Sequence, residues 1–473
     1  MNSRYRYLGK NVLIFAISSF GTKVLSFFLV PLYTNILTTA EYGTADIITT
    51  TAILMGYILT LNIADSVLRF ALEKKESGKA ILSYGLRILT IGSVIAAAGL
   101  LAAWKLNVFR WQWYCYLFLW GYYYFTSLYQ ILSNYLRAED KVVQVALAGI
   151  IVTIVMILSN ILFLLVIPIG IVGYLISMVA GPLAASVYCM VTAHVSPRDF
   201  FTAGGSAPLR REMRAYSAPL MLNSIALWIN TFLDKYFVLA ILGVAQNGIY
   251  AVSYKIPTIL STCYTVFNQA WNLSAIKEIN AEDSGSFYSA TYKVYNAFIC
   301  LACSGIILIN IPISRLLFAK EFFAAWQYAS ALLIAIMFNA LTAFLGSIFS
   351  AIKKTNLVAS TTIAAAAINT LGNFLLIPSC GVQGAAIATA ISYGVMWAIR
   401  VFMLNKHIHL SLNLKKDLIV YTLLILQSVL EHTPDHCYVG QALCFAAIAA
   451  LYFRELKPLA KAFLDKTLRK VRI

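Results

Sequence analysis

The sequence predicts an all-α, polytopic membrane protein, and three observations lead to this fold class. Of its 473 residues, 60% are hydrophobic and 12% are charged, with a mean hydropathy of +0.78; soluble proteins are about half apolar and about a quarter charged. About fourteen stretches reach the roughly 20 mostly apolar residues that a membrane-spanning helix needs. A weak internal repeat divides most of them into two halves. We therefore predict two six-helix lobes related by pseudo-two-fold symmetry, plus two C-terminal helices.

The expected spans follow one another along the chain with only short polar breaks. The first follows a short basic start but lacks a small-x-small cleavage site, so we interpret it as a retained helix and not as a signal peptide. Several later spans are only moderately apolar, as expected of helices that face a partner helix or a water-filled cavity. The spans centre near Ile17, Thr50, Val94, Phe125, Ile154, Met178, Ala226, Thr262, Ala302, Ile336, Ala366, Ala390, Leu423 and Phe445.

The placement of the basic residues predicts the topology. Lysine and arginine number 36 against 19 acidic residues, giving a formal net charge of +17. The basic residues gather in alternate connections, and the intervening ones hold few, chiefly Lys105, Arg110, Arg315 and Lys320. By the positive-inside rule both termini are cytoplasmic, which requires an even number of spans. We therefore expect these basic residues to lie against the lipid bilayer and not to bind nucleic acid. The tail after Arg454 is either a basic amphipathic helix on the inner leaflet or a solvated segment.

Two segments of the first half resemble two segments of the second half, and they follow in the same order. The sequence ILTTAEYGTADI (36–47) aligns with ILGVAQNGIYAV (241–252), and an Asn, a Pro and a Gly-x-x-Gly follow in both halves. Parallel repeats of this kind commonly flank a substrate site near the bilayer midplane. We predict three parts: an N-lobe of the first six spans (1–213), a C-lobe of the next six (214–404), and the last two spans with a basic cytoplasmic tail (405–473).

The connections between the spans leave no room for a soluble catalytic domain. The longest cytoplasmic one covers 194–214. No nucleophile–base pair, metal cluster, phosphate-binding glycine loop or nucleotide motif is apparent. We expect a transporter that is not driven directly by ATP, and no enzyme, catalytic residue, metal or cofactor.

Ionisable residues inside the spans are the candidate functional residues, because a charge at the bilayer centre costs at least about 2.5–3.5 kcal/mol on insertion scales. Asp65 and Arg69 are four residues apart and can pair on one helix face. The neighbours Asp234 and Lys235 point about 100° apart and need partners on other helices. Bases outnumber acids, so a cavity lined by them suits an anionic headgroup such as a diphosphate; salt bridges between the halves are the alternative. The cavity residues, which include the candidate partners of Asp234, are Lys23, Arg69, Lys235 and Lys255.

The region around Asp234 resembles a known family. The run YSAPLMLNSIALWINTFLDKYF (216–237), with Gly248, Tyr250 and Trp271 beyond it, looks like the seventh and eighth spans of the polysaccharide transporters. These are the Wzx-type oligosaccharide and O-antigen repeat-unit flippases of the multidrug/oligosaccharidyl-lipid/polysaccharide exporter superfamily. LTTAEYG (37–43) and ADSVLRFALEKK (64–75) match that family as well. Lys235 stands where the family usually has arginine, which keeps the charge but loses the bidentate fork.

The resemblance implies a flippase that moves a polyprenyl-diphosphate-linked oligosaccharide across the bacterial cytoplasmic (inner) membrane by alternating access. The cargo would serve capsule, exopolysaccharide or O-antigen biosynthesis, with a glycan polymerase and a chain-length regulator as possible partners. Coupling to an ion gradient is implied too, and Asp234 or Asp65 would carry the ion. The alternatives are a lipid II flippase, a small-molecule antiporter of the same superfamily, and a membrane glycosyltransferase or polysaccharide polymerase, which typically needs a large external loop.

Overall fold

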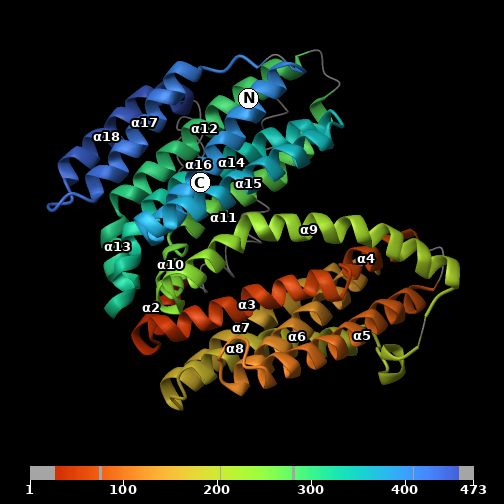
Figure 1. The fold of residues 1–473 in the computed structure, drawn as a ribbon. Coiled ribbons are helices and arrows are strands. Elements are labelled where there is room, and N and C mark those ends of the chain that lie inside the picture. Colours follow the sequence, from red (N-terminus) through yellow and green to blue (C-terminus); the bar gives the residue numbers. More distant parts are fainter. Residues whose placement is uncertain (1–26, 74–76, 203, 280–282, 409, 458–473) are drawn as a thin grey trace, which may run out of the picture. The chain divides into compact units, whose positions relative to one another are not determined.

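The computed structural model describes residues 27–73, 77–202, 204–279, 283–408 and 410–457. Within these ranges every regular element is a helix (Figure 1), which confirms the predicted all-α class. Packing separates two compact units: an N-terminal unit, Asn35–Tyr236, and a C-terminal unit, Phe237–Ile473 together with the segment up to Thr34. The division into 1–213, 214–404 and 405–473 stays a prediction.

The N-terminal unit is built around α6 (Trp113–Ala138), which packs against α3, α4, α5 and α8. Short turns connect its helices, among them η1 (Leu162–Val166) and η2 (Pro197–Phe200). The helices α2 and α9 each cross a limit between the units. The other helices are α2 (Val30–Ile36), α3 (Thr39–Leu59), α4 (Ile63–Glu73), α5 (Gly78–Lys105), α7 (Val142–Ile161), α8 (Ile171–Thr192) and α9 (Ala207–Leu242).

The second expected span is broken in the structure. It begins at α3, whose first turn is closed by a capping box between Thr38 and Glu41. It is interrupted after Leu59, and α4 continues at an angle of 50° to α3. Leu61 and Asn62 in the break have φ values of +53° and +50°, a left-handed conformation that is uncommon for residues other than glycine. The break therefore interrupts the regular helical hydrogen bonds inside a membrane-spanning region, and turn-like bonds such as Leu61 N–H to the Ile58 carbonyl and Asn62 N–H to the Tyr57 carbonyl replace them.

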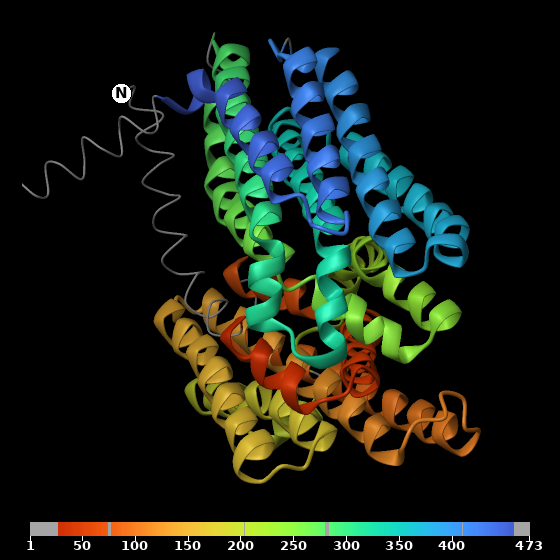
Figure 2. The same cartoon turned by 90° about the vertical axis from the view of Figure 1, so that its left-hand side faces the viewer.

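The C-terminal unit surrounds α14 (Trp326–Ala351), which packs against α11, α12 and α16. Figure 2 shows the long helices of this unit, coloured green to blue, lying side by side. Its span corresponding to α3–α4 is also interrupted, between α10 and α11. The remaining elements are α10 (Val244–Ser253), α11 (Pro257–Glu278), α12 (Ser284–Leu308), α13 (Asn310–Leu317), η3 (Lys320–Ala325), α15 (Thr355–Cys380), α16 (Val382–Asn405), α17 (Leu414–Glu431) and α18 (Tyr438–Leu451).

The hairpins α7–α8 and α15–α16, one in each unit, turn in the same way. Gly170 precedes α8 with φ +58° and ψ −134°, and Gly381 precedes α16 with φ +60° and ψ −144°. Three residues later, a Cβ on Gly173 would lie 2.6 Å from a backbone oxygen, and one on Gly384 would lie 2.3 Å from another. In both hairpins, therefore, the first glycine of the Gly-x-x-Gly adopts a positive φ and the second allows a close approach to the backbone. This shared geometry supports the internal repeat.

The helices α17 and α18, which lie outside the repeat, pack along α12 (Figure 2). Polar side chains on one face of α17 join it to the unit: Ser304 bonds to Gln427 at 2.6 Å, and Ser428 to Ser330 at 2.9 Å. Asn310 donates to Glu431 at 2.7 Å. Hydrogen bonds between helices hold membrane bundles together, since lipid gives apolar faces little reason to associate.

The chain is a multi-pass membrane protein. Within the described ranges, 8 helices are long and apolar enough to cross a membrane, or up to 9 if the bent pair α3–α4 is one span. Each expected span centre lies in a helix, apart from Ile17, which falls outside the described residues. The total of about fourteen spans stays a prediction.

Candidate functional site

An ion pair joins α9 to α3 inside the N-terminal unit. The Lys235 Nζ lies 2.7 Å from the Asp46 Oδ1, and the two side chains are 10% and 16% exposed. The second carboxylate oxygen of Asp46 is buried and has no hydrogen-bond partner among the described residues. The partner that the structure gives to Lys235 is thus an acid that our sequence analysis left out of the candidates.

Asp234 is buried beside this pair, with 4% of its surface exposed. Its Oδ1 accepts a hydrogen bond from the backbone N–H of Lys235 at 2.9 Å. The Lys235 ammonium also lies 5.5 Å from the centre of the Phe232 ring, a distance that allows a cation–π attraction. The two neighbouring charges therefore lie in one polar region of α9.

Further polar contacts hold α9 against α3 and α4. The Trp228 indole N–H donates to the Thr50 carbonyl at 2.9 Å, and the Tyr236 and Thr51 hydroxyls are 2.6 Å apart. Along α4, the hydroxyls of Ser66 and Ser217 are 2.8 Å apart. We call this set of contacts, including Lys235 and Asp46, the α9 seam. Because polar atoms can exchange one partner for another, such a seam suits helices that must separate and rejoin.

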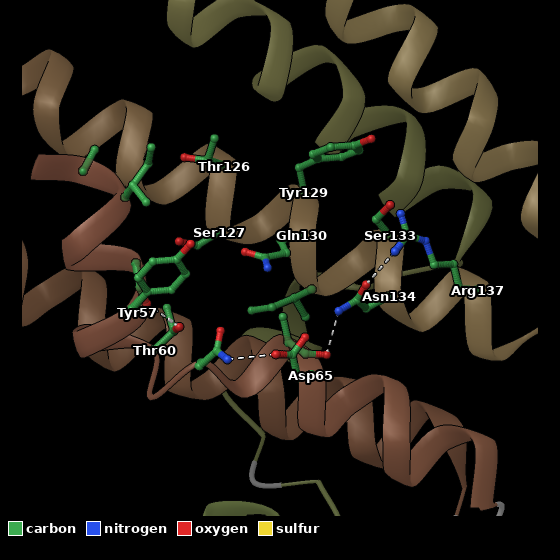
Figure 3. A pocket seen from close by; sticks show the side chains of 16 residues that line it. Tyr57, Thr60, Asp65, Thr126, Ser127, Tyr129, Gln130, Ser133, Asn134 and Arg137 are labelled. Carbon is green, nitrogen blue, oxygen red and sulfur yellow. Dashed lines mark hydrogen bonds between the residues drawn. The ribbon is translucent and has the colours of Figure 1, made fainter. Parts of the chain in front are cut away.

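A pocket of about 510 Å³ opens in the same unit where α3 breaks (Figure 3). Its volume is within the range of about 300–1,000 Å³ that is usual for ligand sites. The walls come from the end of α3, the start of α4 and the second half of α6. Its polar and aromatic lining residues are Tyr57, Thr60, Asn62, Asp65, Thr126, Ser127, Tyr129, Gln130, Ser133, Asn134 and Arg137.

Hydrogen bonds between these residues compensate for the helix break. Asn62 donates to the Asp65 carboxylate at 2.8 Å, and Asn134 donates to the Ala64 carbonyl at 3.0 Å (Figure 3). Arg137 in turn reaches the Asn134 side-chain oxygen at 3.4 Å. A non-helical backbone at membrane depth needs such partners or a water-filled cavity. The pocket therefore combines one carboxylate, one guanidinium, amides and hydroxyls.

The structure separates the predicted pair of Asp65 and Arg69. Asp65 lies in the pocket, whereas the Arg69 side chain is 59% exposed and pairs with Glu73 at 2.6 Å. Both pairings use residues four apart on a helix, and the exposed end of α4 favours the second. Of the two acids within reach of Arg69 along the helix, Glu73 and not Asp65 is thus its ion-pair partner.

Lys255 and Lys23 are the other two candidate lysines. Lys255 is a half-buried residue of the break between α10 and α11 in the C-terminal unit. Lys23 lies outside the described residues. The structure therefore brings Asp234 and Lys235 together with Asp46, and places Asp65 in the pocket of the same unit.

The C-terminal unit contains a buried charge that our sequence analysis did not identify. Arg400 is 4% exposed, and its guanidinium donates to the Thr342 carbonyl at 2.7 Å and to the Thr361 and Thr362 hydroxyls at 3.0 Å each. These acceptors are neutral. The signal in the sequence was present, since Arg400 lies in the last turns of the expected span centred near Ala390, but our list of ionisable residues inside the spans did not include it. Among the described residues, no group of three or more His, Cys, Asp or Glu could hold a metal ion.

The fold resembles that of solved membrane proteins. A solved structure of the lipid II flippase MurJ, in an inward closed conformation, superposes with a TM-score of 0.67 at 13% identity, covering 96% of this chain and 100% of that one. An inward-facing multidrug resistance MATE family transporter of the MOP superfamily superposes with a TM-score of 0.65 at 13% identity, covering 81% and 95%. At such identities the likeness shows a shared fold and no more.

The sequence shows the family. The profile of the family described as "Polysaccharide biosynthesis protein" matches residues 8–272, and the chain belongs to this family. The probable low-salt glycan biosynthesis flippase Agl15 of Haloferax volcanii is 23% identical over 209 residues, which are 42% of this chain and 43% of Agl15. The uncharacterized membrane protein MJ1068 of Methanocaldococcus jannaschii is 26% identical over 179 residues, 38% of this chain and 34% of that protein. The chain thus matches less than half the length of these curated relatives. The predicted resemblance to polysaccharide transporters is confirmed at the level of the family.

Proposed function

We propose that this protein is a flippase that translocates a polyprenyl-diphosphate-linked oligosaccharide across the membrane by alternating access. The observation that carries the proposal is the polar pocket at the α3–α4 break, in a chain of the polysaccharide biosynthesis family. A transporter of apolar drugs has little use for such a lining. The partial match to Agl15, a probable low-salt glycan biosynthesis flippase, supports the same substrate class.

The pocket has the chemistry that a sugar needs. Each hydroxyl of a sugar ring both donates and accepts hydrogen bonds, and the carboxylate of Asp65, the amide of Gln130 and the guanidinium of Arg137 supply both kinds of partner. The rings of Tyr57 and Tyr129 offer apolar faces with a hydroxyl group beside them. We place one or more sugar residues of the cargo here.

The diphosphate of the cargo would be bound by basic side chains, with Lys235 as the first candidate. Lys235 is held by Asp46 through one carboxylate oxygen. A phosphate oxygen that replaces Asp46 would leave Lys235 paired and would remove this ion pair of the α9 seam, which weakens the attachment of α9 to α3. Binding of the anion would then favour a different arrangement of helices, as a ligand must if it is to shift a conformational equilibrium.

The remaining assignments belong to the same proposal. Lys23, Arg69 and Lys255 would contribute positive charge along the path of the diphosphate, and Asp65 or Asp234 would carry a coupling ion. The protein would act in a bacterial cytoplasmic membrane with both termini in the cytoplasm, in capsule, exopolysaccharide or O-antigen biosynthesis. A glycan polymerase and a chain-length regulator would be partners downstream.

A translocation assay on the purified full-length chain tests the proposal. Proteoliposomes would contain a polyprenyl-diphosphate-linked oligosaccharide with a fluorophore on the sugar, and external dithionite would bleach only the molecules in the outer leaflet. We expect the wild type to bring nearly all of the fluorophore within reach of dithionite, and Lys235→Ala and Lys255→Ala to slow this step strongly. Lys415→Ala, at an exposed lysine at the start of α17, is the matched control and should behave as the wild type.

Two results would contradict the proposal. Bleaching that stops at half of the fluorophore with the wild type would mean that the glycan lipid is not translocated. Translocation of lipid II but not of the oligosaccharide lipid would favour the lipid II flippase instead. Equal rates for Lys235→Ala and Lys415→Ala would remove Lys235 from the substrate path.

A further inference from the structure

A second cavity lies in the N-terminal unit, between the end of α5 and the start of α6, and its lining is almost wholly apolar. Its volume is about 610 Å³, again within the range of about 300–1,000 Å³ for ligand sites. The residues that form most of its walls are Leu100, Leu101, Trp104, Trp113, Leu117 and Trp120. The groove is thus lined by large rings and branched side chains and lacks the polar residues of the pocket in Figure 3.

One part of this groove is fixed, and another is open. Trp120 is held by a hydrogen bond from its indole N–H to the Ser93 carbonyl at 3.1 Å, and its ring stacks on Tyr124 with centroids 5.4 Å apart. Trp104 and Trp113, in contrast, are 47% and 61% exposed. Tryptophan rings favour the interface between lipid and water, so Trp104 and Trp113 belong at the level of the headgroups.

The open end of the groove is positively charged. Lys105, the last residue of α5, follows Trp104, and Arg110 belongs to the connection to α6; both side chains are exposed. From residue 78 to residue 138 the sequence contains no Asp or Glu. Glu41 acts on Tyr114 electrostatically from α3, but its carboxylate accepts hydrogen bonds from the backbone and side chain of Thr38. An anion at the end of the groove would therefore meet two exposed cations.

The groove also contains one polar group without a partner. Tyr116 lines the cavity, is 5% exposed, and has a hydroxyl with no hydrogen-bond partner among the described residues. Its ring lies against Phe109 and Trp111 of the connection, at centroid distances of 6.4 and 5.9 Å. A buried hydroxyl of this kind costs free energy unless a partner reaches it, and an oxygen of a phosphorylated ligand would be such a partner.

We propose that this groove binds the lipid carrier of the cargo, with the isoprenoid chain against the tryptophan rings and the phosphate between Lys105 and Arg110. The inference rests on the proposed function, which supplies a polyprenyl lipid as ligand. A polyprenyl phosphate without its glycan, a single branched chain with a small, doubly charged headgroup, fits one apolar groove with two cations near its open end. A phospholipid has two acyl chains and a larger headgroup. The charge pattern predicts that this end of the hairpin is external, so the site would receive the carrier after translocation.

Photochemical labelling of the full-length chain in nanodiscs of phosphatidylethanolamine and phosphatidylglycerol tests the inference. The probe is a polyprenyl phosphate with a diazirine in its isoprenoid chain, and mass spectrometry maps the labelled peptides. We expect labels on α5 and α6 within residues 97–120, which excess unlabelled polyprenyl phosphate suppresses and excess phosphatidylglycerol does not.

Variants separate groove binding from general contact with lipid. Leu117→Trp narrows the groove, and labelling should fall by about fourfold for each CH₂-sized contact that the chain loses. Ile150→Trp, at an apolar residue of α7 that is 47% exposed and outside the groove, is the matched control and should label as the wild type. Exchanging both Lys105 and Arg110 for Gln should remove the preference for polyprenyl phosphate over uncharged polyprenol while leaving the polyprenol label unchanged.

Three results would overturn the inference: equal competition by phosphatidylglycerol, labels spread outside 97–120, or equal labelling of Leu117→Trp and Ile150→Trp. The assay involves neither sugar nor translocation. It can therefore fail while glycan transport is observed, and it can succeed while glycan transport fails, so the two proposals are tested separately.

Discussion

Removing either partner of the Lys235–Asp46 pair is expected to destabilise the N-terminal unit. The pair connects α9 with α3, and its charged atoms are 2.7 Å apart, with 10% and 16% of the two side chains exposed. Lys235→Met leaves the Asp46 carboxylate largely buried without its cation. Asp46→Asn leaves the Lys235 ammonium without its anion. The double variant removes both charges and keeps side chains of similar size.

The size of the effect follows from the distance and the burial. With an effective dielectric constant of about 20, two unit charges 2.7 Å apart attract each other by about 6 kcal/mol. The loss of hydration of both groups offsets much of this attraction. Breaking a buried pair by removing one partner costs about 3–5 kcal/mol, whereas replacing both partners is often nearly neutral. We therefore expect each single variant to lose several kcal/mol and the double variant to recover most of that loss.

Thermal unfolding of the purified chain in detergent measures the effect, with Lys415→Met as the control for loss of a lysine. The expected order of melting temperatures is wild type, then the double variant, then the two single variants. If the losses of the single variants add up in the double variant to within about 0.5 kcal/mol, the two charges do not interact and the α9 seam lacks its ion pair.

Three further predictions concern other elements. Gly384→Ala should destabilise the α15–α16 hairpin, because its Cβ would lie 2.3 Å from a backbone oxygen, whereas Gly394→Ala, whose Cβ would meet a ring carbon at 3.6 Å, should be tolerated; thermal unfolding compares the two, and equal stability would contradict the tight turn. Arg400→Met should lower the melting temperature by several degrees, because hydrogen bonds to a charged group contribute about 1.5–3 kcal/mol each; an unchanged value would mean that the buried guanidinium does not hold α14, α15 and α16 together. Asp65→Asn should slow translocation in the dithionite assay, while Asp140→Asn, at an exposed loop residue, should not; equal rates would exclude a role for the pocket carboxylate.

Much of the fold could be predicted from the sequence because hydropathy acts locally. A run of apolar residues prefers lipid whatever its distant neighbours are. Glycine is the residue type that most easily adopts a positive φ, so Gly170 and Gly381 mark turns of the backbone. The break after Leu59 could not be predicted in this way. The segment Thr60–Asn62 contains neither glycine nor proline, and one partner of the backbone just after it is Asn134, which lies 70 residues from Ala64 in the sequence and donates to the Ala64 carbonyl.

The site was harder to predict than the fold, because it depends on which helix faces meet. Asp234 and Lys235 stood out as charges in an apolar run, but Asp46 lies in the segment 36–47, which served as evidence for the repeat and, in part, for the family resemblance. Asp46 is 189 residues away from Lys235 in the sequence, and a local sequence pattern cannot predict a contact between residues so far apart. Similarly, Arg69 has acids at both four residues before and four residues after it, and only the exposed end of α4 decides in favour of Glu73.

The central claim is that this chain translocates a lipid-linked oligosaccharide, and the lipids of the native cell test it most directly. After deletion of the gene, lipid extracts would be analysed by mass spectrometry and the surface glycan would be measured in parallel. We predict that a polyprenyl-diphosphate-linked oligosaccharide accumulates while the surface glycan is lost, and that the intact gene restores both. A normal surface glycan together with accumulated lipid II, or with no accumulated lipid-linked sugar, would contradict the claim.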